Sequence, residues 1–286
     1  MTKVIALANQ KGGVAKTTSA IALAQALALD GKHIMFLDLD PQENASNTLR
    51  LSDKYPSLFD VMTAPEDNKS IFTDSLQPVE GCKNISAIRG DIRLSSADMQ
   101  FNRQGREFII KEHLDKHKGS FDAVIIDTPP TLGILTVNAL TASDTVIVPI
   151  SPDGYSLQGF LQLTETLRTI KRYSNPNLKL GGILITRYVP QTIISREIHE
   201  IAKECAAQVG TKVYQSAIRQ TVSVSESISA QQGIFQYSPT CTAAQDYRAF
   251  MREIKREELT KGGNDRGKQE SGLSAKHRSD VSEHER

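Results

Sequence analysis

A glycine-bearing loop near the N-terminus carries the residues best suited to chemistry. Residues 9–18 read Asn-Gln-Lys-Gly-Gly-Val-Ala-Lys-Thr-Thr and lie between an apolar run at 4–8 and an alanine- and leucine-rich run at 19–29. A strand, a loop of inward-pointing amides and a helix N-terminus together form an anion site, to which a lysine adds a full positive charge. This order predicts a phosphate-binding loop in which Lys16 reaches the β- and γ-phosphates of a nucleotide and the Thr17 hydroxyl binds Mg²⁺.

The loop departs from the general pattern at two positions. Glycine is expected directly before the lysine, where this chain has Ala15, and also at the position of Gln10. A methyl group at Ala15 is tolerated if the backbone there is near helical, but it is costly if φ is positive. The alternative is an ordinary strand-to-helix turn with its lysines in solvent. The strand, the Lys-Thr-Thr triplet and the helix in the expected order favour the phosphate loop.

Carboxylates follow two further apolar runs. Asp38 and Asp40 come at the end of a run at 33–37, and Asp127 ends the run 121–127. Parallel strands point their carboxyl ends into the crevice where α/β sheets bind ligands. Asp127 is therefore placed to hold Mg²⁺ directly or through water, and Asp38 and Asp40 share one side of the chain by the period of two. The alternative is that these aspartates only end strands or cap the following helices.

Apolar runs of strand length alternate with helical patterns along the chain, which predicts a doubly wound, mostly parallel α/β sheet with helices on both faces. The further strands are expected at 84–89, 145–150 and 178–186, with a short edge strand at 213–214, and the longer helices at 108–117, 132–140, 156–173, 195–209, 222–230 and 243–258. Residues 1–258 are thus one predicted domain. Residues 259–286 are polar and charged with almost nothing to bury, so we expect a disordered tail.

Composition excludes several classes of protein. The 286 residues are 39% hydrophobic and 23% charged, with a net charge of +1, so any binding to nucleic acid must use a local patch. Cys82, Cys205 and Cys241 stand far apart, which argues against a zinc site, a metal cluster or a disulfide framework and suits a reducing cytosol. No apolar run approaches the ~20 residues of a membrane span.

Three motifs together resemble one known family. Lys11-Gly12-Gly13 followed by Lys16-Thr17-Thr18 resembles the deviant Walker A box of the ParA/MinD family. The runs 38–42 (Asp-Leu-Asp-Pro-Gln) and 127–130 (Asp-Thr-Pro-Pro) resemble two further motifs of that family. The resemblance covers about residues 1–258 and implies a P-loop ATPase of the ParA partition type, in the short form without an N-terminal DNA-binding domain.

The resemblance implies roles for particular residues. The catalytic residues would be Lys11, Lys16 and Asp40, with Lys11 reaching the nucleotide of a second subunit and Asp40 orienting the attacking water. The metal would be held at Thr17, Asp40 and Asp127. ATP would contact Lys11, Gly12, Gly13, Val14, Ala15, Lys16, Thr17, Thr18, Thr186, Arg187, Ile218 and Arg219. Arg219 could stack on the adenine base, but a surface salt bridge is an equal alternative.

The implied partners are a second copy of the chain joined through ATP, a centromere-binding protein of the ParB type, and DNA bound without sequence preference. The protein would be cytoplasmic and nucleoid-associated, without a membrane anchor. The chain departs from the family where relatives carry arginine, at Gln220, Ser223, Thr240 and Thr242. DNA binding would then use other basic residues or be weak. The candidates are Lys203, Arg219, Arg252, Lys255 and Arg256, each of which could equally belong to a solvated helix face.

Other functions stay open at this point. A ParA-like ATPase could position a protein cargo, or act as a MinD-like spatial regulator. A biosynthetic or metal-cluster relative, similar to nitrogenase iron protein or the amidoligases, is disfavoured by the cysteine positions and by the lack of a visible substrate domain. A nucleotide-binding protein without hydrolysis is the non-enzymatic alternative, suggested by Ala15.

Overall fold

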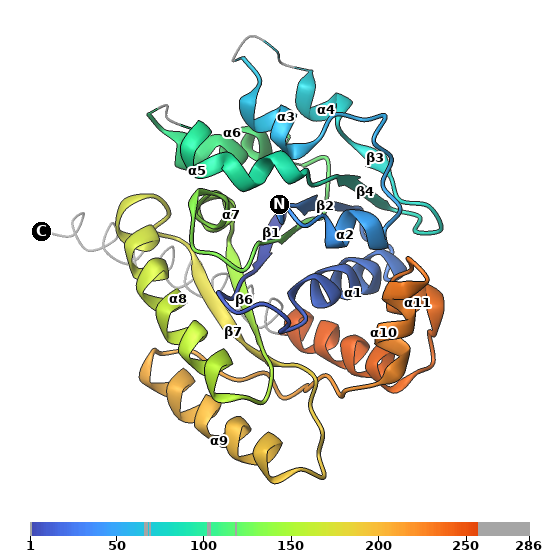
Figure 1. Cartoon of the computed structure of the whole chain (residues 1–286), viewed down its shortest axis with the longest axis vertical. Coiled ribbons are helices and arrows are strands. Elements are labelled where there is room, and N and C mark those ends of the chain that lie inside the picture. The colour runs from blue at the N-terminus through green and yellow to red at the C-terminus, as the bar shows by residue number, and fades with distance from the viewer. Residues whose placement is uncertain (1, 66–67, 69, 102–103, 118, 257–286) are drawn as a thin grey trace, which may run out of the picture.

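The computed structural model describes residues 2–256 except 66–67, 69, 102–103 and 118 (Figure 1). The predicted tail at 259–286 and the expected end of the last helix at 258 lie outside the described residues. Within that part of the chain, no helix combines the length and apolar character that crossing a bilayer requires.

The described strands form one seven-stranded sheet in the order β3-β4-β2-β5-β1-β6-β7. The strands are β1 Lys3–Leu7, β2 Ile34–Asp38, β3 Gln77–Pro78, β4 Ile85–Ile88, β5 Ala123–Asp127, β6 Thr145–Ile150 and β7 Lys179–Ile185. Every neighbouring pair is parallel except β3 with β4 at the edge. The predicted doubly wound, mostly parallel sheet is confirmed.

Helices cover both faces of this sheet (Figure 1). They are α1 Lys16–Leu29, α2 Asn44–Thr48, α3 Leu58–Thr63, α4 Ile71–Asp74, α5 Ala97–Gln100, α6 Ile109–Lys116, α7 Ile134–Ala142, α8 Gly154–Tyr173, α9 Ile193–Gln208, α10 Val222–Ser229 and α11 Ile234–Tyr237. Two 3₁₀ turns lie at Ile92–Ser96 and Arg106–Phe108, and residues 242–256 are also helical.

Side-chain alternation along the strands decides which helices pack on which face. In β1, Ile5 and Leu7 belong to one apolar cluster with α1 and the helix at 242–256. Val4 and Ala6 belong to a second cluster with α3, α6 and α7. Because both faces are covered, the central strands are apolar throughout, as the runs in the sequence indicate.

The sheet topology brings three strand ends together. β5 lies between β1 and β2, and Asp127 at its carboxyl end is in register with Leu7 of β1 and Asp38 of β2. The phosphate loop follows β1 directly, so it emerges beside both carboxylates. This edge of the sheet is the crevice predicted from the sequence.

Some elements differ from the prediction. The expected edge strand at 213–214 makes only an isolated bridge, between Val213 and Ile183 of β7. The short elements β3, α2, α4 and α11 were not expected. Each has two to five residues, too few for a hydrophobic period to be recognised.

Candidate functional site

The loop at 9–15 leaves β1 and enters α1 through two left-handed residues. Gly13 has φ 75°, and Ala15, which immediately precedes the helix, has φ 58° and ψ 34°. Of the two conformations considered from the sequence, near-helical or positive φ, Ala15 therefore has the positive φ that is costly for a residue with a Cβ. A residue with a Cβ in this conformation is strained by roughly 1–2 kcal/mol.

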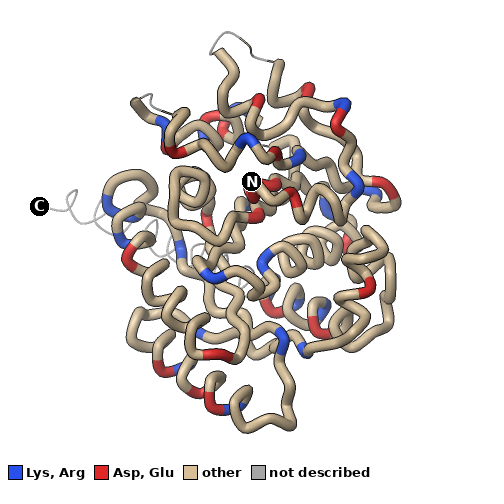
Figure 2. Tube along the Cα trace, viewed as in Figure 1, with Lys and Arg blue, Asp and Glu red and all other residues tan. Residues whose placement is uncertain are grey.

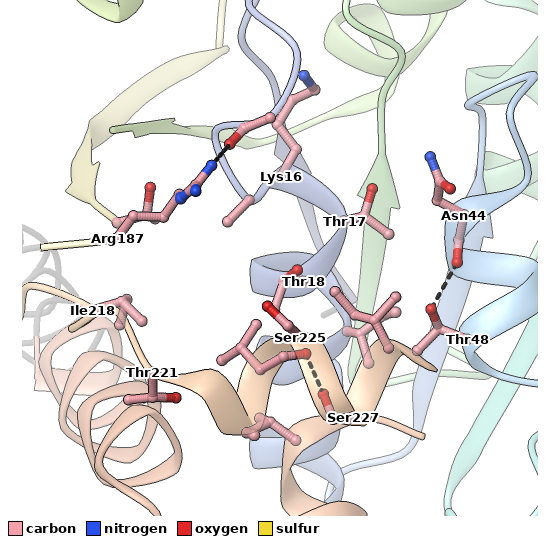
Figure 3. Close-up of a pocket in the computed structure, with 18 of the residues that line it drawn as sticks. Lys16, Thr17, Thr18, Asn44, Thr48, Arg187, Ile218, Thr221, Ser225 and Ser227 are labelled. Atoms are coloured by element: carbon pink, nitrogen blue, oxygen red, sulfur yellow. Dashed lines mark hydrogen bonds between the residues drawn. The ribbon is translucent and has the colours of Figure 1, made fainter. Parts of the chain in front are cut away.

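Side chains hold three carbonyl oxygens of the loop. The Lys16 ammonium donates to the carbonyl of Lys11 at 2.9 Å, and Arg187 Nη1 donates to that of Gly13 at 3.2 Å (Figure 3). The buried Thr186 hydroxyl donates to the carbonyl of Val14 at 3.1 Å or to that of Ile150 in β6 at 3.0 Å. The loop carbonyls are thus engaged with the protein, which suits a site whose amides are to bind an anion.

Lys16 lies between the loop and the carboxylates. The side chain is buried, and burial lowers the pKa of its ammonium while the nearby Asp127 and Asp40 carboxylates act in the opposite direction. Asp40 is buried at the edge of the site, where it accepts a hydrogen bond from the amide of Gln42 at 3.0 Å. Burial raises the pKa of Asp40, an effect that this hydrogen bond and Lys16 oppose.

Asp38 has a different environment from Asp40. It is fully buried and accepts hydrogen bonds from the amide and the hydroxyl of Ser46, at 2.8 and 2.6 Å. Burial nevertheless raises its pKa to about 6. Asp38 therefore fixes the turn that leads into α2, whereas Asp40 faces the site.

Asp127 has the chemistry of a metal ligand. It is fully buried, and neither carboxylate oxygen meets hydrogen-bond geometry with any of the described residues, although the Thr17 hydroxyl lies close enough to affect its pKa. Burial, followed by the charge of Asp38, raises its pKa well above the ordinary value, while the neighbouring Thr17 hydroxyl and Lys16 act in the opposite direction. A buried carboxylate with no partner calls for a cation or water.

The donors present fit Mg²⁺. No group of three or more His, Cys, Asp or Glu side chains in the described part of the chain is arranged to hold a metal by itself. Mg²⁺ usually keeps several waters and binds one or two carboxylates together with substrate phosphates. Thr17, Asp40 and Asp127 beside a phosphate loop match that arrangement.

Lys11 is held on the other side of its loop. Its ammonium forms an ion pair with Asp153, the N-cap residue of α8, and lies 5.7 Å from the centre of the Tyr155 ring. The Asp153 carboxylate also accepts from the Ser156 amide at 2.9 Å. In this single chain Lys11 therefore contacts its own subunit, and the contact with a second subunit stays a prediction. Asp153 was missed, although it follows β6 closely and the strand-end rule applied to Asp38 could have found it.

One pocket of about 640 Å³ joins most of the predicted nucleotide contacts (Figure 3). This volume is within the usual range for small-molecule sites. The predicted residues that line it are Gly12, Gly13, Ala15, Lys16, Thr17, Thr18, Asp40, Thr186, Arg187, Ile218 and Arg219. Lys11, Val14 and Asp127 do not line it, because Lys11 turns toward α8 and the other two are fully buried. Pro130 and residues of α10 also line the pocket and were not predicted.

Arg219 is engaged in a salt bridge. Its Nη2 lies 2.6 Å from Asp246 Oδ1 and its Nε 2.9 Å from Asp246 Oδ2, while its amide donates to the same carboxylate at 2.9 Å. The guanidinium is therefore bound to the helix at 242–256, which agrees with the salt-bridge alternative given for Arg219 from the sequence. Asp246 was missed because it lies 27 residues further along the chain.

Other candidate DNA-binding cations also have acidic neighbours. Lys203 pairs with Glu200 at 2.8 Å, and Lys255 pairs with Asp30. Figure 2 shows basic and acidic positions interspersed along α8 and α9. Arg252 is exposed and has no ion-pair partner among the described residues.

Comparison with known proteins agrees with this geometry. A family model described as an AAA domain matches residues 2–180. The sporulation initiation inhibitor protein Soj of Bacillus subtilis is 34% identical over 257 residues, which cover 89% of this chain and 98% of the relative. The chromosome partitioning protein ParA of Caulobacter vibrioides is 34% identical over 259 residues, which cover 88% and 93%.

Solved structures show the same fold. Cobyrinic acid a,c-diamide synthase from Mycobacterium smegmatis, with a bound ATP analog and magnesium, is 32% identical with a TM-score of 0.76, over 91% of this chain and 96% of the other. McdA from Cyanothece, in a complex with ATP, is 18% identical with a TM-score of 0.77, over 89% and 96%, and supports the fold alone. From the phosphate loop, the strand-end carboxylates and these full-length similarities, we conclude that the chain belongs to the ParA/Soj family of partition ATPases.

Proposed function

We propose that this ATPase is a nucleotide-dependent dimerising switch in the partition of a plasmid or chromosome, formed by residues 1–258. The observation that carries the proposal is the buried Asp127 carboxylate beside Lys16 and the phosphate loop, for which the described part of the chain offers no partner in hydrogen-bond geometry. Bound Mg²⁺ would neutralise phosphate charge at this position. The names of relatives 34% identical, a Soj and a ParA, support the role in partition.

Particular side chains have particular roles in this proposal. Lys16, Thr17 and Thr18 hold the phosphates at the start of α1, and Thr186, Arg187 and Ile218 line the far side of the pocket. Asp40 orients the attacking water, since it borders the pocket beside Lys16. Phosphoryl transfer to water depends mainly on positioning and charge stabilisation, which these groups supply.

The position of Lys11 determines what must change if the chain is to dimerise through ATP. In the single chain its ammonium pairs with Asp153, so reaching a second nucleotide requires that this ion pair opens. Because the pair is about one-third exposed on both sides, opening it costs little. ATP would then join two subunits, with each Lys11 completing the other subunit's site.

Two substitutions test the switch. Lys16→Ala should lower ATP affinity at least tenfold, measured by titration with a fluorescent nucleotide. Asp40→Ala should keep ATP binding, lose phosphate release and accumulate dimers, measured by sedimentation at saturating ATP. Asp53→Ala, at an exposed position outside the pocket lining, is the matched control and should behave as wild type. Normal turnover in Asp40→Ala would reject its role, and a wild-type monomer at saturating non-hydrolysable ATP would reject the switch.

We further propose that the ATP dimer binds DNA without sequence preference, through backbone phosphates. The usual arginines are replaced and Lys203, Arg219 and Lys255 are paired with acids, so binding should be weak and steeply salt-dependent. A gel shift with long random DNA and ATP tests this, with Arg252→Ala compared with Arg168→Ala, whose arginine is already paired with Glu165. No shift at low salt would reject DNA binding and, with it, nucleoid association in the cytoplasm.

A centromere-binding protein of the ParB type is the proposed stimulating partner. Phosphate release should rise when that protein and DNA are both added, and an unchanged rate would contradict the pairing. A protein cargo is the alternative within the same chemistry. A cargo-bound adaptor that raised turnover, where centromere-binding proteins did not, would favour it.

An ATP-dependent amidating enzyme is the second candidate function. It is favoured by the solved synthase that is 32% identical over 91% of this chain. Incubation with ATP, an amide donor and cobyrinic acid distinguishes the two candidates. Formation of an amidated product would favour the amidating enzyme over the partition switch. ATP hydrolysis without an amidated product would exclude amidation of cobyrinic acid.

A further inference from the structure

Helix α7 begins at a residue that cannot cap it. Its N-cap position is Gly133, which has no side chain to accept a hydrogen bond from the first turn. The amide of Ile134 donates instead to Asp98 Oδ1 at 2.8 Å, and Asp98 lies 36 residues earlier, in α5. A carboxylate at this place also interacts favourably with the positive end of the helix.

Gly133 and Asp98 fit one another. A Cβ at position 133 would lie 2.5 Å from Asp98 Oδ2 and 3.0 Å from Oδ1, so the carboxylate occupies the space of the missing side chain. The backbone at Gly133, with φ −75° and ψ −170°, is extended and open to any residue. The backbone would thus accept any residue, and a Cβ at position 133 is excluded only while the exposed Asp98 carboxylate keeps this place.

The start of α7 is connected to the nucleotide pocket. The chain runs from Asp127 through Thr128 and Pro130 to Gly133, and Pro130 lines the pocket. The Thr128 hydroxyl donates to the carbonyl of Leu7 at 2.8 Å, which holds the beginning of this segment.

The other end of the segment is held by α7 itself. The Thr136 hydroxyl donates to the carbonyl of Thr131 at 2.6 Å, so the first turn of α7 fixes the residues directly before it. Only an ordered first turn can do this, and the Asp98 hydrogen bond orders it.

We propose that Asp98 is a positioning residue for ATP hydrolysis: through the first turn of α7, it holds residues 128–131 in place between Asp127 and the nucleotide pocket, which Pro130 lines and where the γ-phosphate would lie under the proposed function. Asp98 itself does not line this pocket. The inference depends on the proposed ATPase site and adds a residue from a separate element to it. ADP lacks the γ-phosphate, so ADP binding does not require this segment to be held.

The rest of α7 is secured independently of Asp98. Asn138 Nδ2 donates to the carbonyl of Arg106 at 2.8 Å, and the amide of Ile110 donates to Asn138 Oδ1 at 3.2 Å. Asp98→Ala should therefore leave the fold intact and loosen only the first turn.

The test uses four forms of the full chain: wild type, Asp98→Ala, Gly133→Ser and the double variant. Asp98→Ala should lower kcat for ATP about fivefold, the effect of losing an N-cap of ordinary strength, while the Kd for ADP changes less than twofold. Gly133→Ser alone should also be impaired, because its Cβ meets Asp98. In the double variant the serine fits the vacated space and supplies its own cap, so kcat should recover.

Hydrogen exchange of residues 128–136 in the nucleotide-free proteins is the second readout, and it does not depend on catalysis. Protection should fall in Asp98→Ala and return in the double variant. If wild type hydrolyses no ATP but exchange follows this pattern, the proposed function fails while Asp98 still orders the segment. Unchanged kcat in Asp98→Ala, an equal loss of ADP binding, or a double variant no better than either single one would overturn the inference.

Discussion

Replacing Ala15 with glycine should stabilise this protein. The left-handed backbone at Ala15, φ 58° and ψ 34°, costs a residue with a Cβ roughly 1–2 kcal/mol. Glycine removes that strain but gives the unfolded chain more freedom, which costs about 0.4–1 kcal/mol. The free energy of unfolding should therefore rise by about 0.5–1 kcal/mol, the opposite of what glycine does inside a helix.

Urea unfolding of the nucleotide-free protein measures this change. The midpoint should move to higher urea with an unchanged m-value, and Tm should rise by about 1–4 °C for a domain of this size. Ala207→Gly, at an exposed position in α9, is the matched control and should lose up to about 1 kcal/mol. ATP affinity should be retained in Ala15→Gly, because the backbone amide stays in place. If both variants lost stability, the reasoning about strain in the loop would be refuted.

Two further changes test the packing around the loop. Gly159→Ala on α8 would place a Cβ 2.6 Å from Asn9 Oδ1 and should cost about 1–3 kcal/mol of stability and weaken ATP binding. Gly154→Ala on the same helix is the control, because its Cβ would meet none of the described atoms within 4 Å. Equal effects of the two substitutions in unfolding and nucleotide titrations would contradict this close approach. Burial acts to raise the pKa of Asp153, but hydrogen bonds from Lys11 and neighbouring groups hold it at about 2, below the ordinary 3.8. Because the pKa is lowered, the ionised Asp153 contributes to the free energy of unfolding above about pH 4, and this contribution is lost as pH falls toward about 2. Asp153→Asn should therefore lack this part of the pH dependence of unfolding. An unchanged pH profile would contradict a stabilising role for the Lys11–Asp153 ion pair.

The central strands and the phosphate loop could be predicted because their signals are local. A parallel strand covered on both faces must be apolar, so Ile34–Asp38 and Ala123–Asp127 stand out in the sequence. Strand ends in a parallel sheet share one edge, so the strand ends that carry Asp38 and Asp127 could be placed beside the loop, although Asp38 turned out to hold Ser46 instead of facing the pocket.

Interactions between distant segments could not be predicted in the same way. The pairing of Arg219 with Asp246 and of Asp98 with the start of α7 joins residues tens of positions apart, and no periodicity links them. The conformation of Ala15 was also undecided, because sequence alone does not give φ for a residue that differs from the expected glycine. Val213 shows a further limit, since two apolar residues at a sheet edge made one bridge instead of a strand.

The anchoring of the loop carbonyls has a consequence for how nucleotide affinity can change. Thr186 and Arg187 follow β7 directly, and they hold the loop from a strand two places away from β1 in the sheet. The shape that receives phosphate is thus imposed by the sheet before any ligand arrives, so little chain freedom remains to be lost on binding. Substitutions that shift the β6–β7 edge should therefore alter nucleotide affinity without touching the nucleotide. The loop at 9–15, copied alone into another scaffold, would not keep this affinity.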